Sequence, residues 1–364
     1  MNSVLQRWYK KYFSDPQGIA LAVVLVLGFL IIYFMGNMLA PVLGAIVLAY
    51  LLEGVVVVLQ RWKLPRLLAV TIVFMLFMAL LLFVLLGLMP LLSRQVGELV
   101  QELPNMIGRG QESLMRLPEL YPTLVSEDQV KEVMRDIGIY VRNLGQSVLS
   151  FSLASITGLF TWIVYLVLVP VLIFFFLKDK GQIMNWISTI LPSERKLTTQ
   201  VWQEMNTQIG NYVRGKLIEI VIVGVVSYAT FAIMGLNYAM LLGALVGLSV
   251  IIPYIGAVVV TAPVMLIAYF QWGWGSEFAY IGIAYLVIQT LDGNVLVPLL
   301  FSEAVDLHPV AIIIAVLVFG GLWGFWGVFF AIPLANLVAA VIKAWPRASH
   351  SVLAAQAPDE GAER

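Results

Sequence analysis

Long apolar runs, separated by short polar stretches, dominate the sequence. Five of them cover residues 19–36, 38–59, 67–92, 153–177 and 217–235. A helix needs about 20 apolar residues to cross a bilayer. Each run therefore predicts a membrane span, and we expect a tight turn at Gly36-Asn37 between the first two.

Two stretches break this pattern with helical amphipathic spacing. Residues 93–150 are rich in charge and carry apolar residues on one helical face (Val96, Leu99, Val100 and Leu103, then Val130, Val133, Met134 and Ile137). Residues 196–216 repeat such spacing in a second charged stretch. We predict a small helical extracytoplasmic insert at 93–150 and an interfacial amphipathic helix at 196–216.

The C-terminal third contains no Lys or Arg between Leu217 and Ile342, and Gly and Pro interrupt its apolar runs. Two pairs of short apolar arms flank such interruptions: 239–252 with 257–270, and 310–319 with 328–342. Between the pairs, residues 278–300 are long enough to cross and are expected to break at Gly293 and Pro298. The pattern predicts two helical hairpins, and it leaves open whether they are re-entrant or complete spans.

Composition and charge support the same class. The chain has 364 residues, of which 61% are hydrophobic and 12% charged, against roughly 25% charged in ordinary soluble domains. The fold class is therefore an all-α polytopic membrane protein of about eight hydrophobic segments, including the two Gly/Pro-broken hairpins, plus the helical insert. Net charge is zero, which gives no indication of a nucleic-acid partner.

Motif searching predicts that the chain is not an enzyme. There is no cysteine, no HExxH, no GxSxG and no Walker loop, so no catalytic residue, metal ligand set or cofactor is predicted.

Basic residues predict the orientation in the membrane. They gather before the first run, after the second and after the fourth (Arg7, Lys10 and Lys11; Arg61, Lys63 and Arg66; Lys178 and Lys180). By the positive-inside rule these segments and both termini are expected in the cytoplasm. The sequence divides into five predicted regions. Residues 1–92 hold spans one to three, residues 93–150 form the insert, and residues 151–216 hold span four and the amphipathic helix. Residues 217–345 form a transport core, and residues 346–364 are a disordered tail.

Asp292 is the sharpest functional candidate, within the stretch LDGNVLVP at 291–298. A carboxylate inside a membrane costs several kcal/mol and is by default a functional hypothesis. Gly293 and Pro298 predict a helix break that frees carbonyls, and Asn294 offers another oxygen. Together they predict a site for a small polar solute, a proton or a monovalent cation. The competing interpretation places Asp292 near a membrane surface as a helix cap.

Further residues complete the set of candidates. The turn Pro253, Tyr254 and Gly256 is expected beside Asp292 in the substrate or ion region. Glu219 and Arg214 are second-rank candidates, and Glu219 is expected to pair with Lys216 one helical turn away. Glu53 is expected to reach the cytoplasmic face. Small residues four apart predict close helix packing, at Gly243 with Gly247 and at Gly320 with Gly324.

Several stretches together resemble the autoinducer-2 exporter family of bacterial permeases. They are PVLGAIVLAYLL (41–52), VPVLIFFFLKD (169–179), YVRGKLIEIVIVG (212–224), GALVGLSVIIPYIGAVV (243–259), QTLDGNVLVPLLFSEAVDLHP (289–309) and GGLWGFWGVFFAIPLA (320–335). The resemblance implies an inner-membrane protein with an extracytoplasmic insert after its third span. It also implies export of a small molecule such as autoinducer-2, although some relatives resemble Na⁺(Li⁺)/H⁺ antiporters. Family members commonly carry Glu at the position of Asp292, so the carboxylate is kept.

We therefore predict a gradient-driven secondary transporter that exports a small polar molecule, working in the bilayer as a homo-oligomer. A Na⁺(Li⁺)/H⁺ antiporter is the first alternative. A passive oligomeric channel would need a polar stripe along a whole span, and none is present in the sequence. In the third alternative, a scaffold for envelope proteins, residues 93–150 would bind the partners.

Overall fold

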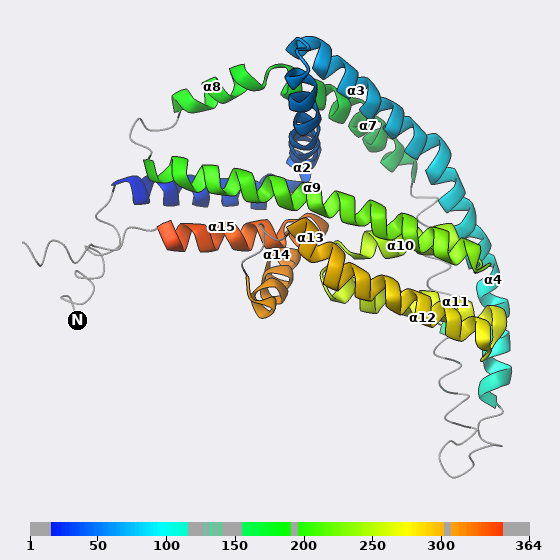
Figure 1. The fold of residues 1–364 in the computed structure, drawn as a ribbon. Helices are drawn as coiled ribbons and strands as arrows, with labels where there is room; N and C mark the ends of the chain where they lie inside the picture. Colours follow the sequence, from blue (N-terminus) through cyan, green and yellow to red (C-terminus); the bar gives the residue numbers. More distant parts are fainter. Residues whose placement is uncertain are drawn as a thin grey trace, which may run out of the picture. The chain divides into compact units, whose positions relative to one another are not determined.

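A computed structural model describes residues 16–115, 155–190, 196–301 and 307–344, with a few isolated positions between 128 and 139. Every regular element in this part of the chain is helical, as the apolar runs predict. The elements, shown in Figure 1, are α2 (Pro16–Arg61), α3 (Arg66–Phe83), the π-helix η1 (Val84–Leu88), α4 (Met89–Met115), α7 (Ser155–Lys178), α8 (Lys180–Ile190), α9 (Lys196–Ile233), α10 (Ala239–Ser249), α11 (Ile255–Trp272), α12 (Ser276–Leu291), the π-helix η2 (Asp292–Leu296), α13 (Val297–Phe301), α14 (Pro309–Phe329) and α15 (Ala331–Ala344).

Six helical stretches of the described residues are long and apolar enough to cross a membrane. By length and composition they are Met38–Arg61, Arg66–Gly110, Asn206–Ile233, Ile255–Trp272, Ser276–Phe301 and Pro309–Phe329, although the last is interrupted at Gly324. Four shorter apolar helices accompany them: Leu25–Gly36, Ile163–Lys178, Ala239–Ser249 and Ala331–Val341. The chain is thus the polytopic helical membrane protein that its composition predicts.

The chain forms two compact units. Unit 1 comprises Met1–Ala40, Lys180–Tyr212 and Glu303–Arg364, and unit 2 comprises Pro41–Asp179 and Val213–Ser302. The tight turn predicted at Gly36-Asn37 is absent, because α2 continues through these residues as one helix. The division falls instead at Pro41, whose nitrogen has no hydrogen to donate to the preceding helical turn.

The start of the predicted insert belongs to the core of unit 2. Helix α4 continues α3 through η1, so the apolar face at 96–103 is not a separate helix. Leu99 packs against the buried cluster of α9–α12, and Gln95 Oε1 accepts a hydrogen bond from Leu241 N at 2.8 Å. The second predicted helix of the insert lies largely outside the described residues. So does the predicted tail at 346–364.

Helices α2, α3 and α7 form one buried cluster of unit 2 around Val56, Val70 and Ile173. Arg66 joins all three helices at its edge. Its guanidinium contacts both carboxylate oxygens of Glu53 at 3.3 Å and donates to the Leu177 carbonyl at 2.6 Å. Glu53 is therefore part of a partly buried ion pair, and its predicted position at the cytoplasmic face stays a prediction.

Helix α9 is one continuous helix, although the sequence predicted an interfacial helix over 196–216 and a separate span after it. No Gly-Pro signal separates the two stretches, so the helical hydrogen bonds continue from one into the other. The boundary between the units falls inside this helix, after Tyr212.

Glycines let α9 and α10 approach closely in unit 2. A Cβ atom at Gly243 would lie 2.7 Å from the backbone of Tyr228, and one at Gly247 would lie 2.7 Å from the Ile220 carbonyl oxygen. The predicted packing role of this Gly pair is therefore confirmed. Gly324 serves another purpose: nothing lies within 4 Å of its added Cβ, and its φ of 58° breaks α14.

Both predicted hairpins are present, and each turns at a glycine-dependent contact. In unit 2, a Cβ at Gly256 would overlap the Ser249 carbonyl oxygen at the end of the preceding arm. In unit 1, a Cβ at Gly327 would overlap the Phe319 carbonyl oxygen. Residues eight apart in a straight helix are about 12 Å apart, so the chain reverses between Phe319 and Gly327.

The predicted break at Gly293 and Pro298 is wrong. Residues 276–301 remain helical throughout, and the helix only widens to a π-helical turn over Asp292–Leu296. Val297 N donates to the Asp292 carbonyl, one residue further back than in an α-helix. Because this extra residue is accommodated just before Pro298, the missing proline N–H does not interrupt the helix.

Candidate functional site

Three buried charged residues meet in unit 2, and we call Lys216, Glu219 and Asp292 the charge cluster. Lys216 and Glu219 face inward from α9, and Asp292 opens η2. Their exposed fractions are 4%, 2% and 9%. Charged side chains are almost never buried to this degree unless paired. The cluster therefore marks the place in unit 2 where the fold departs most from an apolar core.

Lys216 is the centre of the cluster. Its Nζ lies 2.7 Å from Glu219 Oε2 and donates to the Val250 carbonyl oxygen at 2.8 Å. The same Nζ lies 5.3 Å from the centre of the Phe301 ring, at cation–π distance. The predicted pairing of Glu219 with Lys216 is thus present. These contacts link α9 to the end of α10 and to α13.

Asp292 faces the pair and adds a second carboxylate. Its charge interacts with both Lys216 and Glu219. The Oδ1 atom is buried and has no hydrogen-bond partner in the part of the chain that the structure describes. Asp292 is therefore neither exposed to lipid nor fully solvated, and its depth in the membrane stays a prediction. With all three groups ionised, the cluster carries one positive and two negative charges.

The hairpin turn lies next to the cluster because Lys216 binds its first residue, Val250. Tyr254 adopts φ 62° and opens α11, which returns past the end of α10. Gly256 is buried, whereas the Tyr254 side chain is 60% exposed. Of the predicted turn residues, Pro253 and Gly256 shape the backbone, and the Tyr254 side chain points outward.

Four other predicted site residues do not join the cluster. Gly293, Asn294 and Pro298 lie on the exposed side of their helix. The Asn294 side chain donates to the Thr290 carbonyl at 2.9 Å and so serves its own helix. Arg214 is also exposed, and its guanidinium lies beside Gly54 of α2.

The inner face of α12 carries polar groups that the sequence reading missed. Tyr285, Gln289 and Asp292 follow at i, i+4 and i+7, which places them on one side of the helix. Tyr285 Oη donates to the Ala257 carbonyl at 2.8 Å, and Gln289 Nε2 is buried with no hydrogen-bond partner among the described residues. The i, i+4, i+7 spacing of these polar residues could have identified them in the sequence.

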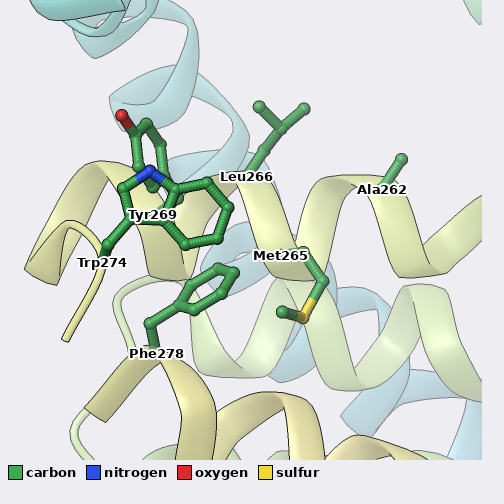
Figure 2. Close-up of a pocket in the computed structure, with 6 residues that line it drawn as sticks. All are labelled: Ala262, Met265, Leu266, Tyr269, Trp274 and Phe278. Carbon is green, nitrogen blue, oxygen red and sulfur yellow. The ribbon is translucent and has the colours of Figure 1, made fainter. Parts of the chain in front are cut away.

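An apolar pocket of unit 2 lies away from the charges. Its volume is about 280 Å³, and it is lined by Ala262, Met265, Leu266, Tyr269, Trp274 and Phe278 (Figure 2). These residues belong to the end of α11 and the start of α12, whereas the charge cluster adjoins the opposite ends of those helices. Three rings pack edge to face there, with Trp274 and Phe278 centred 5.0 Å apart. We place the candidate site at the charge cluster and treat this apolar pocket as helix packing.

The described residues hold no group of three or more His, Cys, Asp or Glu that could ligate a metal ion. Fold and site together define a polytopic helical membrane protein with a buried ionic cluster beside a broken hairpin. This is the architecture of a membrane transporter.

The comparisons identify the family. The profile described as "AI-2E family transporter" matches residues 22–347, so the chain belongs to this family of permeases. It is 50% identical over 346 residues to the putative permease PerM of Escherichia coli strain K12, covering 95% of this chain and 98% of that one. It is 29% identical to the putative transport protein YueF of Bacillus subtilis, covering 86% and 85%. It is 23% identical to the AI-2 transport protein TqsA of E. coli, covering 89% and 92%. The predicted family is confirmed.

Proposed function

We propose that this permease is a secondary transporter that exports a small polar molecule and uses the charge cluster to couple export to an ion gradient. The observation that carries the proposal is the surplus carboxylate of Asp292, buried against an ion pair that is already formed. A structural ion pair needs one partner for each charge. A second carboxylate can bind a proton or a cation in one step of transport and release it in another.

The net charge of the cluster suggests how an ion could be coupled to transport. The cluster holds one ammonium and two carboxylates, so one added proton or monovalent cation makes it neutral. In surroundings of low dielectric constant a net charge is costly. Binding and release of that proton or cation therefore stabilise different arrangements of the surrounding helices. This is the property that gradient-driven transport requires.

The hairpin turn supplies the neighbouring recognition groups. Backbone carbonyls at the end of α10 and amides at the start of α11 meet there, with partial charges of opposite sign. A small solute rich in hydroxyl and carbonyl groups can hydrogen-bond to both. The inward polar side of α12, with Gln289 and Tyr285, extends this lining.

Autoinducer-2 is the first solute to test, because the names of the family and of its relative TqsA refer to AI-2. Export rather than uptake, cytoplasmic termini, an inner-membrane location, re-entrant hairpins and a homo-oligomeric assembly are part of the same proposal. A Na⁺(Li⁺)/H⁺ antiporter remains the alternative prediction, since the cluster could also take a metal cation.

The test uses full-length protein in liposomes loaded with autoinducer-2 and given a pH gradient of either sign. Efflux that depends on both the protein and the gradient supports the proposal. Asp292→Asn is expected to lose the gradient dependence, whereas Glu53→Gln, at the other buried pair, is expected to keep it. Equal efflux from wild type and Asp292→Asn would contradict a coupling role for the cluster. If no solute moves, an imposed Na⁺ or Li⁺ gradient that changes lumenal pH would favour the antiporter.

A further inference from the structure

The surroundings of Lys216 Nζ are those of a bound metal cation. Its nearest neighbours are a carboxylate oxygen of Glu219 and a backbone carbonyl oxygen at a helix end, both within 2.8 Å. The second carboxylate, Asp292, faces it with a free oxygen. Carboxylates and carbonyls freed at a helix interruption are the oxygen ligands that hold hard cations, Na⁺ among them.

The carbonyl of Val250 is available because of the hairpin. The last carbonyls of an α-helix have no intrahelical partner, and they carry the negative end of the helix dipole. Lys216 reaches this end of α10 because the glycine contacts bring α9 close to it. The side chain is thereby held in place at its tip by two oxygens and the Phe301 ring.

We infer that the Lys216 ammonium occupies the cation position of the charge cluster, so that the cluster excludes Na⁺ and exchanges protons only. A tethered ammonium cannot leave with the solute or cross the membrane. The mobile cation left to balance the surplus carboxylate is then a proton, on Glu219 or Asp292. Among the described residues, these two carboxylates and Lys216 are the charged groups that interact electrostatically here, and α10, α11 and α13 contain no charged residue. The inference rests on the proposed function, because it names the coupling ion of the same site.

It follows that removing the ammonium should create a Na⁺ site. In Lys216→Met the two carboxylates and the Val250 carbonyl lose their cation, while the apolar volume is approximately kept. Na⁺ is then the only abundant small cation that can replace the lost charge when protons are scarce. Lys216→Gln offers a second neutral variant, whose amide can still donate to the Val250 carbonyl.

The experiment follows thermal unfolding of the full-length protein in detergent at pH 8, with NaCl replaced stepwise by choline chloride at constant ionic strength. For wild type we expect no specific effect of Na⁺ on Tm. For Lys216→Met and Lys216→Gln we expect a saturable rise of about 2–4 °C. Adding Glu219→Gln to either variant should abolish the rise, because one ligand is lost.

Two results would overturn the inference. One is a saturable Na⁺ effect on wild type that Glu219→Gln removes, since Na⁺ would then bind beside the ammonium. The other is a folded Lys216 variant with no Na⁺ response. If neither variant folds, the wild-type titration alone decides. Because the readout is binding, failure of the transport assay leaves this result intact, and the two failures are distinguishable.

Discussion

Two ion pairs of unit 2 each hold a buried glutamate, and their surroundings differ by one charge. Arg66 and Glu53 match one positive charge with one negative charge, and the guanidinium also binds a backbone carbonyl. Lys216 and Glu219 are likewise joined, and Lys216 also binds a backbone carbonyl, but Asp292 adds a second carboxylate for which the described residues offer no further cation in an ion pair. The first pair links three helices. The second is one cation short of neutrality.

This difference separates structural from functional burial of charge. A balanced pair is explained by the helices it joins. An unbalanced cluster imposes a lasting cost on the folded state unless a bound proton or cation relieves it. Changing single charges in each pair should therefore give opposite patterns of stability and transport.

The largest effect on stability is expected from Glu219→Gln, which leaves the Lys216 ammonium without its partner. Breaking a buried pair typically costs about 3–5 kcal/mol, and the nearby Asp292 reduces this to roughly 2–4 kcal/mol. Asp292→Asn is the matched change from acid to amide. It should leave stability unchanged or raise it by up to about 1 kcal/mol, because it removes the surplus charge. Unfolding in mixed micelles measures both, and equal losses would show that Asp292 is an ordinary structural partner.

Arg66→Met should lower the free energy of unfolding by roughly 1–3 kcal/mol. The Arg66 side chain is 35% exposed, so solvent screening weakens this pair relative to a fully buried one. The remaining folded protein should keep the ion dependence of wild type, since the charge cluster is untouched. The measurement is transport per folded molecule against pH, and a shifted profile would mean that the two pairs are coupled.

Gly247→Ala should destabilise the protein by about 1–3 kcal/mol, because its Cβ would lie 2.7 Å from the Ile220 carbonyl oxygen. It would also push α10 away from α9 and so weaken the Lys216 contact to Val250. Gly293→Ala is the control, since nothing lies within 4 Å of its added Cβ, and it should stay within about 1 kcal/mol of wild type. Equal losses of stability in Gly247→Ala and Gly293→Ala would contradict the close packing of α9 and α10 at Gly247.

The smallest effect is expected from Asn294→Ala. The side chain is exposed and bonds only to its own helix, so stability should fall by at most about 1 kcal/mol. Coupled transport should be unchanged. A loss of transport comparable to that of Asp292→Asn would place Asn294 in the solute path.

The sequence predicted the class of fold from the lengths of its apolar runs, and it singled out Asp292 as a candidate because a carboxylate is rare in such runs. Runs of about 20 apolar residues specify spans. Asp292 stands out because carboxylates are costly in such runs. The two hairpins followed from Gly and Pro placed where the apolar arms were too short to be ordinary spans.

The rest depends on hydrogen bonds and packing that no local pattern encodes. Whether Pro298 breaks its helix depends on one extra residue in the preceding turn, which a π-helix accommodates. Asn294 and Asp292 are two positions apart, so they face different sides of a helix even though they are neighbours in sequence. Lys216 became visible as a site residue only when α9 met the end of α10.

The most direct test of the account is to add autoinducer-2 to proteoliposomes with no imposed gradient and to record lumenal pH. The account predicts a change in lumenal pH that follows solute movement with wild type and Glu53→Gln, and none with Asp292→Asn. Solute movement without any pH change in wild type, or an unchanged pH response in Asp292→Asn, would contradict it.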